Sequence, residues 1–409
     1  MTRGRAAGAL IGLSGGTFLY TTAEALPIGL LLPMAGDLAV SPSQVGMLVT
    51  AYGAVVMVAS VPLTALVRRV PRRRLLSALL AGFVLSTAVT TSTFALLLVA
   101  RMVTATTHAL FWAVVVPAAA ELFRPALRGR VVAVVFAGGT VALALGVPAG
   151  TWLGDRAGWR ASFLAVAGLG AVVLVVVAAL LPSTRPEDGH AARGATPDAR
   201  RFWLLVAMAV LATAGAIAAY TYVALFVTEV TGLSAASVGA VLFARGIASV
   251  LGILAIGALL ERSPWLALLT TVALQSAALL GLYTFGQRPS VSVGLIALAG
   301  LAFAAFTATL GGLVLQVAPG RSDLAAAAVS AAVNVGITAG AFVGGVALPS
   351  HGVRATVLIG ALLGVAALVL ALGERLIRPA LRLSRGADSR HASAGVGTSS
   401  SSASRRTRV

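Results

Sequence analysis

Long apolar stretches, separated by short polar or glycine- and proline-containing segments, run along almost the whole chain. A helix needs about 20 apolar residues to cross the hydrocarbon core of a bilayer, and the pattern predicts twelve such helices. Their expected limits are 9–32, 44–66, 75–93, 95–119, 131–154, 162–181, 202–227, 235–260, 265–285, 291–317, 324–348 and 355–374. The predicted fold class is therefore an all-α membrane protein with twelve transmembrane helices.

The two halves of the chain repeat each other. Five residues of the first half recur 193 positions further along, and five more recur after 194 positions. The first set is Ser41, Val45, Gly46, Leu66 and Arg69 with Ser234, Val238, Gly239, Leu259 and Arg262; the second is Gly146, Gly150, Gly158, Arg160 and Ala161 with Gly340, Gly344, Gly352, Arg354 and Ala355. Such a repeat predicts two six-helix bundles in the same orientation, a plan typical of transporters.

The polar segments set the expected domain limits. Residues 1–181 form an N-terminal bundle, 182–201 a flexible cytoplasmic linker, and 202–376 a C-terminal bundle. The arginine- and serine-rich segment 377–409 has too few apolar residues to build a core and is expected to be disordered.

Composition supports a membrane location, because the chain is 59% hydrophobic and only 10% charged. Its formal charge of +18 comes from short arginine runs beside the helix ends, where anionic lipid headgroups rather than nucleic acid are the expected partners. Most of the 30 basic residues lie on the side that holds both termini. The positive-inside rule therefore predicts that both termini are cytoplasmic.

The sequence lacks the patterns of an enzyme. It has no cysteine, no metal-spaced cluster of histidines and acids, no carboxylate pair and no phosphate-binding glycine loop. We therefore expect no metal, no cofactor and no direct use of ATP, so that energy must come from a gradient or from another solute.

Glu24 is the only acid placed deep in a predicted span. A charge at the bilayer centre costs about 2.5–3.5 kcal/mol on insertion scales, so this side chain should face a cavity or a partner. Burial favours the protonated form, which makes Glu24 a candidate proton carrier. Pro27 cannot donate to the carbonyl of Ala23, so a bend and a free acceptor are expected beside it. A protonated glutamate that only bonds a neighbouring helix is the alternative.

Arg101 and His108 lie seven residues apart in the fourth span, on one helix face with Trp112. Arg101 is expected either to pair with Glu24 in one state or to form a fixed bond to a carbonyl or carboxylate. His108 is expected either to join a proton relay or bind substrate, or to make an interhelical hydrogen bond.

Other intramembrane polar side chains are candidates for the substrate cavity: Asn334, Gln275, Tyr220 and Tyr222. Polar groups also bond across membrane helices for structural reasons, which leaves both interpretations open. Tyr220 and Tyr222 are two residues apart, so at most one should line the cavity squarely.

Small residues at four-residue spacing mark two helices that approach their neighbours closely. The fifth span contains Gly146, Pro148 and Gly150, and the eleventh contains Gly340 and Gly344. These residues predict either a helix pair that rocks between states or tight packing alone.

The chain resembles the major facilitator superfamily, and within it the twelve-span drug:proton antiporters of the chloramphenicol-resistance and arabinose-efflux-permease group. The resemblance covers residues 8 to 375. It rests on TAEALPIGLLLPMAGDLAVS (22–41), ARMVTATTHALF (100–111), GTVALALGVPAGTWLGDRAGWRASF (139–163) and SAAVNVGITAGAFVGG (330–345).

The resemblance implies alternating access by two bundles and export of a small, often amphipathic compound in exchange for protons. It places Glu24 on the family's proton-coupling acid and Arg101 on its fourth-helix arginine. The family's loop motif is better preserved in the second half, at Gly257, Glu261 and Arg262, than in the first, where Arg68 stands at the acidic position.

The leading hypothesis is thus a monomeric, proton-coupled exporter whose partners are a small-molecule substrate, protons and anionic lipids. A sugar or metabolite exporter or exchanger of the same fold is the first alternative, and a non-transporting membrane sensor is the second.

Overall fold

The computed structural model describes residues 3–67, 69–90, 93–124, 127–182, 197–319 and 322–394, and in these it is all helical. The first half contains α1 Arg3–Gly29, α2 Leu31–Asp37, α3 Pro42–Val67, α4 Arg72–Ala88, α5 Phe94–Glu121, α6 Arg128–Val141, a π-helical turn Ala142–Gly146, α7 Val147–Ala157 and α8 Trp159–Leu180. The second contains α9 Ala199–Tyr220, α10 Val223–Glu229, a 3₁₀ turn Ala235–Ser237, α11 Val238–Arg262, α12 Pro264–Phe285, α13 Pro289–Val317, α14 Ser322–His351 and α15 Val353–Ala394.

Each expected span corresponds to a helix or a broken helix. Ten helices of the described chain are long and apolar enough to cross a membrane, and the bent pair α1–α2 makes eleven. The helix at the third expected span, α4, has 17 residues, which gives about 26 Å at 1.5 Å per residue. It packs between α5 and α8 in the same bundle.

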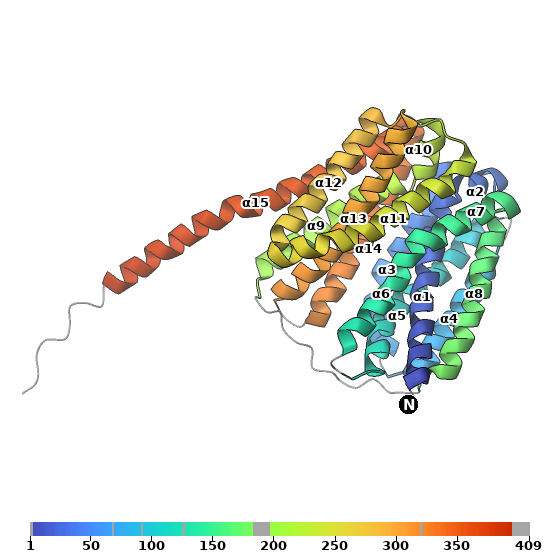
Figure 1. The fold of residues 1–409 in the computed structure, drawn as a ribbon, viewed down its shortest axis with the longest axis horizontal. Helices are drawn as coiled ribbons and strands as arrows, with labels where there is room; N and C mark the ends of the chain where they lie inside the picture. The colour runs from blue at the N-terminus through green and yellow to red at the C-terminus, as the bar shows by residue number, and fades with distance from the viewer. Residues whose placement is uncertain are drawn as a thin grey trace, which may run out of the picture.

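The C-terminal helix continues further than the sequence predicts. We expected residues 377–409 to be disordered, whereas α15 extends to Ala394 and projects away from the bundle (Figure 1). Leucine, alanine and arginine, which are frequent in 376–394, are strong helix formers even where no core is available. Residues 395–409 and most of the expected linker, 183–196, lie outside the described residues.

The halves share features that confirm the repeat. In each half the first long helix breaks and a helix of seven residues follows: α2 after α1, and α10 after α9. Gly158 and Gly352, which are 194 positions apart, both adopt a positive φ at the turn before the last helix of their half. A backbone with positive φ at this turn favours glycine, which explains why both copies carry one.

Two prolines account for the break in the first helix. Pro27 and Pro33 have no backbone N–H, so the carbonyls of Ala23 and Gly29 lose their helical partners, and α1 and α2 meet at 67°. Pro148 acts similarly in the fifth span, where the preceding turn widens into the π-helix Ala142–Gly146.

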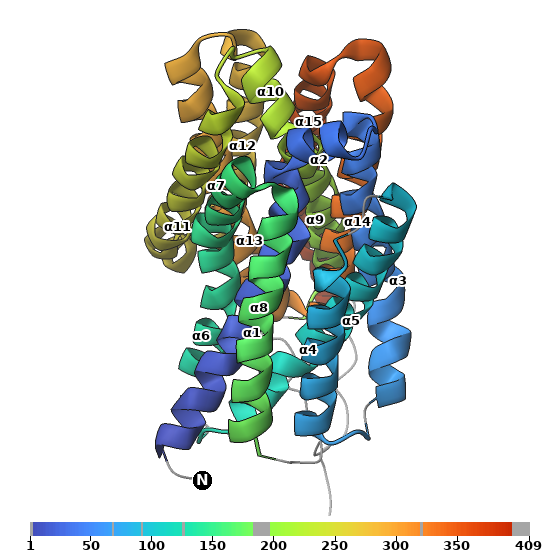
Figure 2. The same ribbon diagram turned by 90° about the vertical axis from the view of Figure 1, so that its right-hand side faces the viewer.

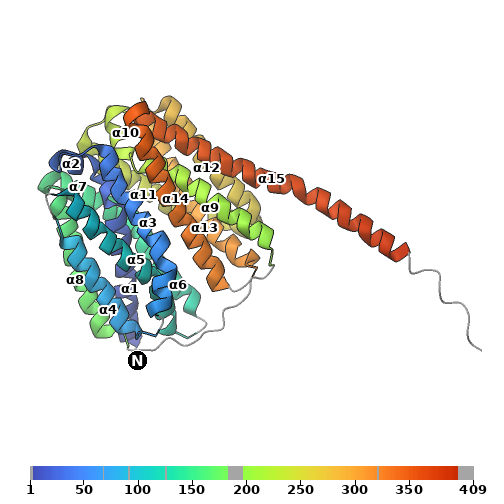
Figure 3. The same ribbon diagram turned by 180° about the vertical axis from the view of Figure 1, so that it is seen from behind.

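The two bundles stand side by side and contact each other mainly through two pairs of helices (Figures 1 and 3). One pair is α3 with α14, and the other is α11 with α7 and the π-helical turn. The short helices α2 and α10 lie at the end opposite the N-terminus (Figure 2). Glycine contacts between the halves include those at Gly46, Gly53, Gly239 and Gly246, which lie in the parts of α3 and α11 nearest that end.

Glycines let the backbones of the two halves meet. A Cβ atom on Gly246 of α11 would collide with the Cα atom of Ala144 in the π-helical turn. A Cβ atom on Gly53 of α3 would lie 2.7 Å from Oγ1 of Thr338 on α14. Both contacts are between halves, so the observed state depends on these two residues lacking side chains.

The α7–α11 contact can be tested by cross-linking, because the chain has no cysteine of its own. A Cβ atom at Gly239 would lie 3.8 Å from Cβ of Trp152, which is the separation that a disulfide requires. We expect Gly239→Cys with Trp152→Cys to cross-link on mild oxidation, to stop transport, and to regain it on reduction. Each single variant serves as the control; failure to cross-link would contradict this packing.

Gly246→Val should reduce that cross-linking. A branched side chain at this position cannot fit against Ala144 unless α11 and the π-helical turn separate. In the double-cysteine background we expect the initial cross-linking rate to fall several-fold. Gly257→Val is the matched control, because a Cβ atom at Gly257 has no neighbour within 4 Å among the described residues. Equal rates in the two variants would show that the contact at Gly246 does not hold the halves together.

Candidate functional site

The carbonyl that Pro27 leaves free is bound by Arg101. The Arg101 guanidinium on α5 donates from Nη1 to the carbonyl of Ala23 at 2.6 Å and from Nη2 to the carbonyl of Glu24 at 3.2 Å. Arg101 is only 3% exposed, and its guanidinium also lies 4.7 Å from the ring centre of Tyr52 on α3. In this state Arg101 therefore bonds to backbone oxygens of α1, which is the second of the two roles that the sequence left open.

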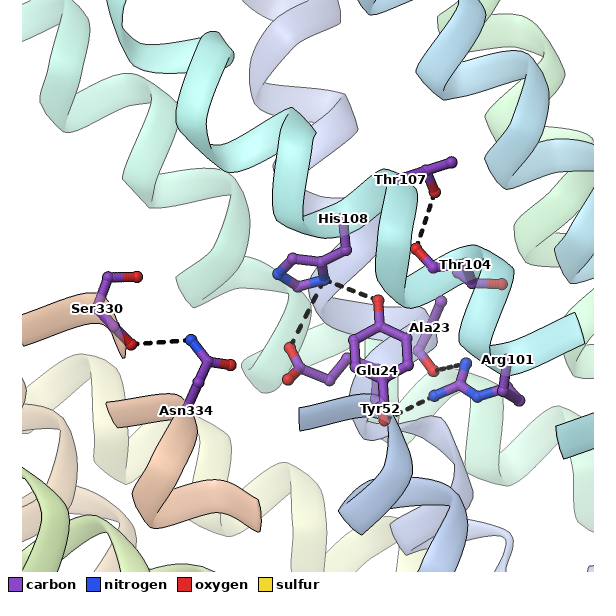
Figure 4. Close-up of polar contacts among 9 residues, drawn as sticks. All are labelled: Ala23, Glu24, Tyr52, Arg101, Thr104, Thr107, His108, Ser330 and Asn334. Atoms are coloured by element: carbon purple, nitrogen blue, oxygen red, sulfur yellow. Dashed lines mark hydrogen bonds and ion pairs between the residues drawn. The ribbon is translucent and has the colours of Figure 1, made fainter. Parts of the chain in front are cut away.

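The carboxylate of Glu24 lies beside His108 instead (Figure 4). Its Oε2 is 4.0 Å from Nδ1 of His108, and the same Nδ1 lies 2.7 Å from the hydroxyl of Tyr52. The Glu24 side chain keeps 21% of its accessible surface, whereas that of His108 keeps 9%. Three titratable groups from α1, α3 and α5 thus form one chain of polar contacts, of which the carboxylate is the most open member.

Trp112 lies next to this cluster. The Trp112 ring is 6.2 Å from the His108 ring and 5.5 Å from that of Phe136. Asn334 of α14 donates to the carbonyl of Ser330 in its own helix at 2.9 Å. Figure 4 shows Asn334 to the left of Glu24 and His108, on a helix of the C-terminal half. Within the described structure its amide has no hydrogen bond to either side chain.

The remaining substrate-cavity candidates separate into two places. Tyr220 and Gln275 line a pocket inside the C-terminal half. Tyr222 is fully buried, donates to the carbonyl of Ala341 at 3.1 Å, and packs on Gly46 of α3. The two tyrosines therefore point to different faces, as their spacing predicts, and Tyr222 lies in the contact between the halves.

The glycines that the sequence marks for close helix approach pack within their own half. Gly146 and Gly150 lie against Thr22 and Leu26 of α1, and Gly340 lies against the backbone of Ala214 of α9. Gly344 packs on Tyr222. Pro148 is close to α11, since a Cβ atom at Gly239 would lie 3.5 Å from its carbonyl oxygen.

The loop motif of the second half shows no latch in this state. Glu261 and Arg262 are exposed at the end of α11, and Gly257 has open space around it. Neither charged residue forms an ion pair within the part of the chain that the structure describes. Arg68, at the corresponding position of the first half, lies outside the described residues.

Tyr52 and Arg245 are two contact residues that the sequence reasoning did not select. Tyr52 joins His108 to Arg101, and Arg245 lines the pocket of the C-terminal half. They are 193 positions apart, so they occupy the same place in the two repeats. Comparing the repeats for positions where both copies carry a large polar or aromatic side chain within an apolar span would have found them.

The bond from Arg101 to Ala23 gives a stability prediction. Arg101→Met should leave the Ala23 carbonyl unpaired, at a cost of about 1–3 kcal/mol. Pro27→Ala restores an N–H that can bind the same carbonyl, so Arg101→Met should cost less in that background. Thermal unfolding of the four proteins in detergent measures the coupling. An identical cost of Arg101→Met in both backgrounds would contradict the assignment.

Two helical bundles with duplicated topology and buried polar groups at their centre define a multi-pass membrane transporter rather than an enzyme. The Major Facilitator Superfamily model matches residues 13–290 and 204–400, and the chain belongs to this family. Its members move small-molecule substrates across membranes. No group of histidines and acids in the described residues is arranged to hold a metal ion.

Curated relatives cover most of the chain. It is 28% identical over 358 residues to a "Probable sugar efflux transporter" of Mannheimia succiniciproducens, covering 86% of this chain and 90% of that protein. It is 31% identical over 382 residues to the "Uncharacterized MFS-type transporter YtbD" of Bacillus subtilis, covering 90% and 96%. The first name supports efflux and the second supports transport within the family. Neither name specifies the drug:proton antiporter group that the sequence resembles.

Solved structures confirm the fold. A bacterial homologue of the human lysosomal transporter Spinster, in an inward-facing and occupied conformation, matches with a TM-score of 0.72 and 16% identity, covering 91% of this chain and 97% of that one. The human organic anion transporter MFSD10 (TETRAN) matches with a TM-score of 0.67 and 18% identity, covering 91% and 100%.

Proposed function

We propose that this protein exports a small, amphipathic compound in exchange for protons, and that Glu24 carries the proton. The observation that supports this most is the position of the Glu24 carboxylate, which lies 4.0 Å from His108 and remains partly accessible. A carboxyl group inside a membrane is stable when it is protonated or when a cation neutralises its charge. Its protonation therefore changes what the centre of the N-terminal half can bind.

Arg101 supports the coupling by fixing the backbone on which Glu24 stands. Its two bonds hold the carbonyls of Ala23 and Glu24 beside the bend at Pro27. Since these bonds occupy the guanidinium, the imidazole of His108 is the side chain that lies beside the Glu24 carboxylate in this state. We expect proton exchange between Glu24 and His108 when the carboxylate is exposed, with the Tyr52 hydroxyl holding the imidazole in place.

The proposed orientation places both termini in the cytoplasm of a bacterial inner membrane, with the arginine runs against anionic lipid. The halves contact each other at the end opposite the N-terminus, so this orientation makes the observed state inward-facing. One proton that enters down 100 mV supplies about 2.3 kcal/mol, which is enough to sustain a substrate gradient of nearly two orders of magnitude.

Sugar export is the second candidate function. Two curated relatives that match over 86% of this chain carry the name "Probable sugar efflux transporter", the second of them from Helicobacter acinonychis at 29% identity. A sugar exporter or exchanger of this fold needs the same alternating access, and a proton-coupled one would use the same proton site. The two candidates therefore differ in the pocket, and an exchanger differs in the coupling as well.

Proton release from everted vesicles tests the proposal. Vesicles with an imposed pH gradient are challenged with cationic, neutral and anionic drugs and with sugars. We expect wild type to give a substrate-triggered proton signal and Glu24→Gln to lose it by at least about tenfold, because the amide cannot release a proton. Glu229→Gln is the matched control, since Glu229 is exposed at the end of α10.

The two variants make the result specific. A normal signal in Glu229→Gln with loss in Glu24→Gln places the proton on Glu24, and the compound that triggers the signal separates drug from sugar export. Full pH-dependent export by Glu24→Gln would remove Glu24 from the proton path.

A further inference from the structure

A second polar centre lies inside the C-terminal half, where an arginine has no acidic partner. Arg245 of α11 is 7% exposed, and its guanidinium stacks on the ring of Tyr220 at 3.8 Å. No carboxylate of the described residues forms an ion pair with it. The face of one tyrosine only partly replaces the water that a buried cation loses, so Arg245 retains donors for an anion.

These side chains line a small cavity of about 30 Å³. Arg245, Tyr220 and Gln275 line one pocket between α9, α11, α12 and α13, and its other walls are apolar, among them Leu279 and Ile296. A pocket with apolar walls and a few convergent polar groups is typical of a small-molecule site.

Gln275 adds a second polar group to the pocket that needs a hydrogen-bond partner. Its Nε2 donates to the carbonyl of Ala212 at 2.8 Å, which fixes the orientation of the amide. Its Oε1 is then buried without a hydrogen-bond partner, in a side chain that is 1% exposed. An unpaired buried acceptor is unfavourable, and a hydroxyl donor on a ligand would satisfy it.

We infer that this pocket binds a small organic acid that also carries a hydroxyl group, with Arg245 taking the carboxylate and Gln275 accepting the hydroxyl proton. The arginine fork matches a carboxylate in two hydrogen bonds, whereas a neutral ligand leaves the cation uncompensated. The apolar walls accept the rest of the molecule. This inference depends on the proposed function only if the bound acid is also the exported solute.

The place of Arg245 in the repeat supports a role in binding rather than in folding. The equivalent residue of the N-terminal half is Tyr52, so the duplicated fold accepts a neutral side chain there. In the N-terminal half the cation of the cluster, Arg101, binds backbone carbonyls of α1. Arg245 has no such bond in the described structure, so its charge is left for a ligand.

Three matched compounds test the assignment: mandelate, its neutral amide mandelamide, and phenylacetate, which lacks the hydroxyl group. Binding to the purified full-length protein in detergent is measured by calorimetry at neutral pH without a gradient. We expect mandelate to bind about tenfold more tightly than mandelamide and several-fold more tightly than phenylacetate. Equal binding of mandelate and mandelamide by wild type would overturn the proposal.

Variants assign each preference to its residue. Arg245→Gln should abolish the preference for mandelate over mandelamide, and Gln275→Leu should abolish that for mandelate over phenylacetate. Arg288→Gln, which removes an exposed arginine from the same half, is the control and should change neither ratio. Survival of the charge preference in Arg245→Gln would overturn the assignment.

Ala219→Phe keeps the test decisive if Arg245→Gln does not fold. Ala219 lines the pocket, so a phenyl ring there should block all three compounds while leaving Arg245 in place. Unchanged mandelate binding by this variant would show that the acid binds elsewhere. Because no proton gradient is present, loss of the Glu24 hypothesis leaves this result standing, and the reverse also holds.

Discussion

A backbone carbonyl inside a bilayer has no water to bind, and the centre of this protein is built around one such group. Pro27 withdraws the helical partner of Ala23, and Arg101 supplies a new one across the bundle at 2.6 Å. This bond joins α1 to α5, holds the bend, and leaves the Glu24 carboxylate facing His108 rather than the guanidinium. The same arginine therefore stabilises the fold directly. It also supports the proposed proton site, because it fixes the backbone that carries Glu24.

Close approach of helices is the second condition on which the architecture depends. Gly246 and Gly53 bring the backbones of the two halves together, and Gly146 and Gly340 bring neighbouring helices together within each half. Without a hydrophobic effect between lipid-embedded helices, such contacts gain their energy from packing. A contact that holds halves together without large side chains can also be broken and reformed, which alternating access requires.

The duplication has produced two halves with one topology and different polar centres. Both have a broken first helix and a positive-φ glycine before the last helix. At the repeat-equivalent position, however, Tyr52 bonds a histidine near an acid, whereas Arg245 stacks on Tyr220 in an apolar pocket. We propose that this divergence separates proton binding in the first half from solute binding in the second.

The sequence by itself determined the membrane class, the position of the helices and the repeat, because each depends on local apolar length or on self-similarity along the chain. It also located Glu24, Arg101 and the carbonyl freed by Pro27, since proline chemistry acts within one helical turn. Only the tertiary structure decided that Arg101 bonds the backbone carbonyls of Ala23 and Glu24 rather than the Glu24 carboxylate, and that Tyr222 lies between the halves. It alone revealed the break before α10, where the sequence has no proline, and the pocket of Arg245. Those features depend on which helix faces meet, and contacts between residues far apart in the chain leave no periodic signal in either segment.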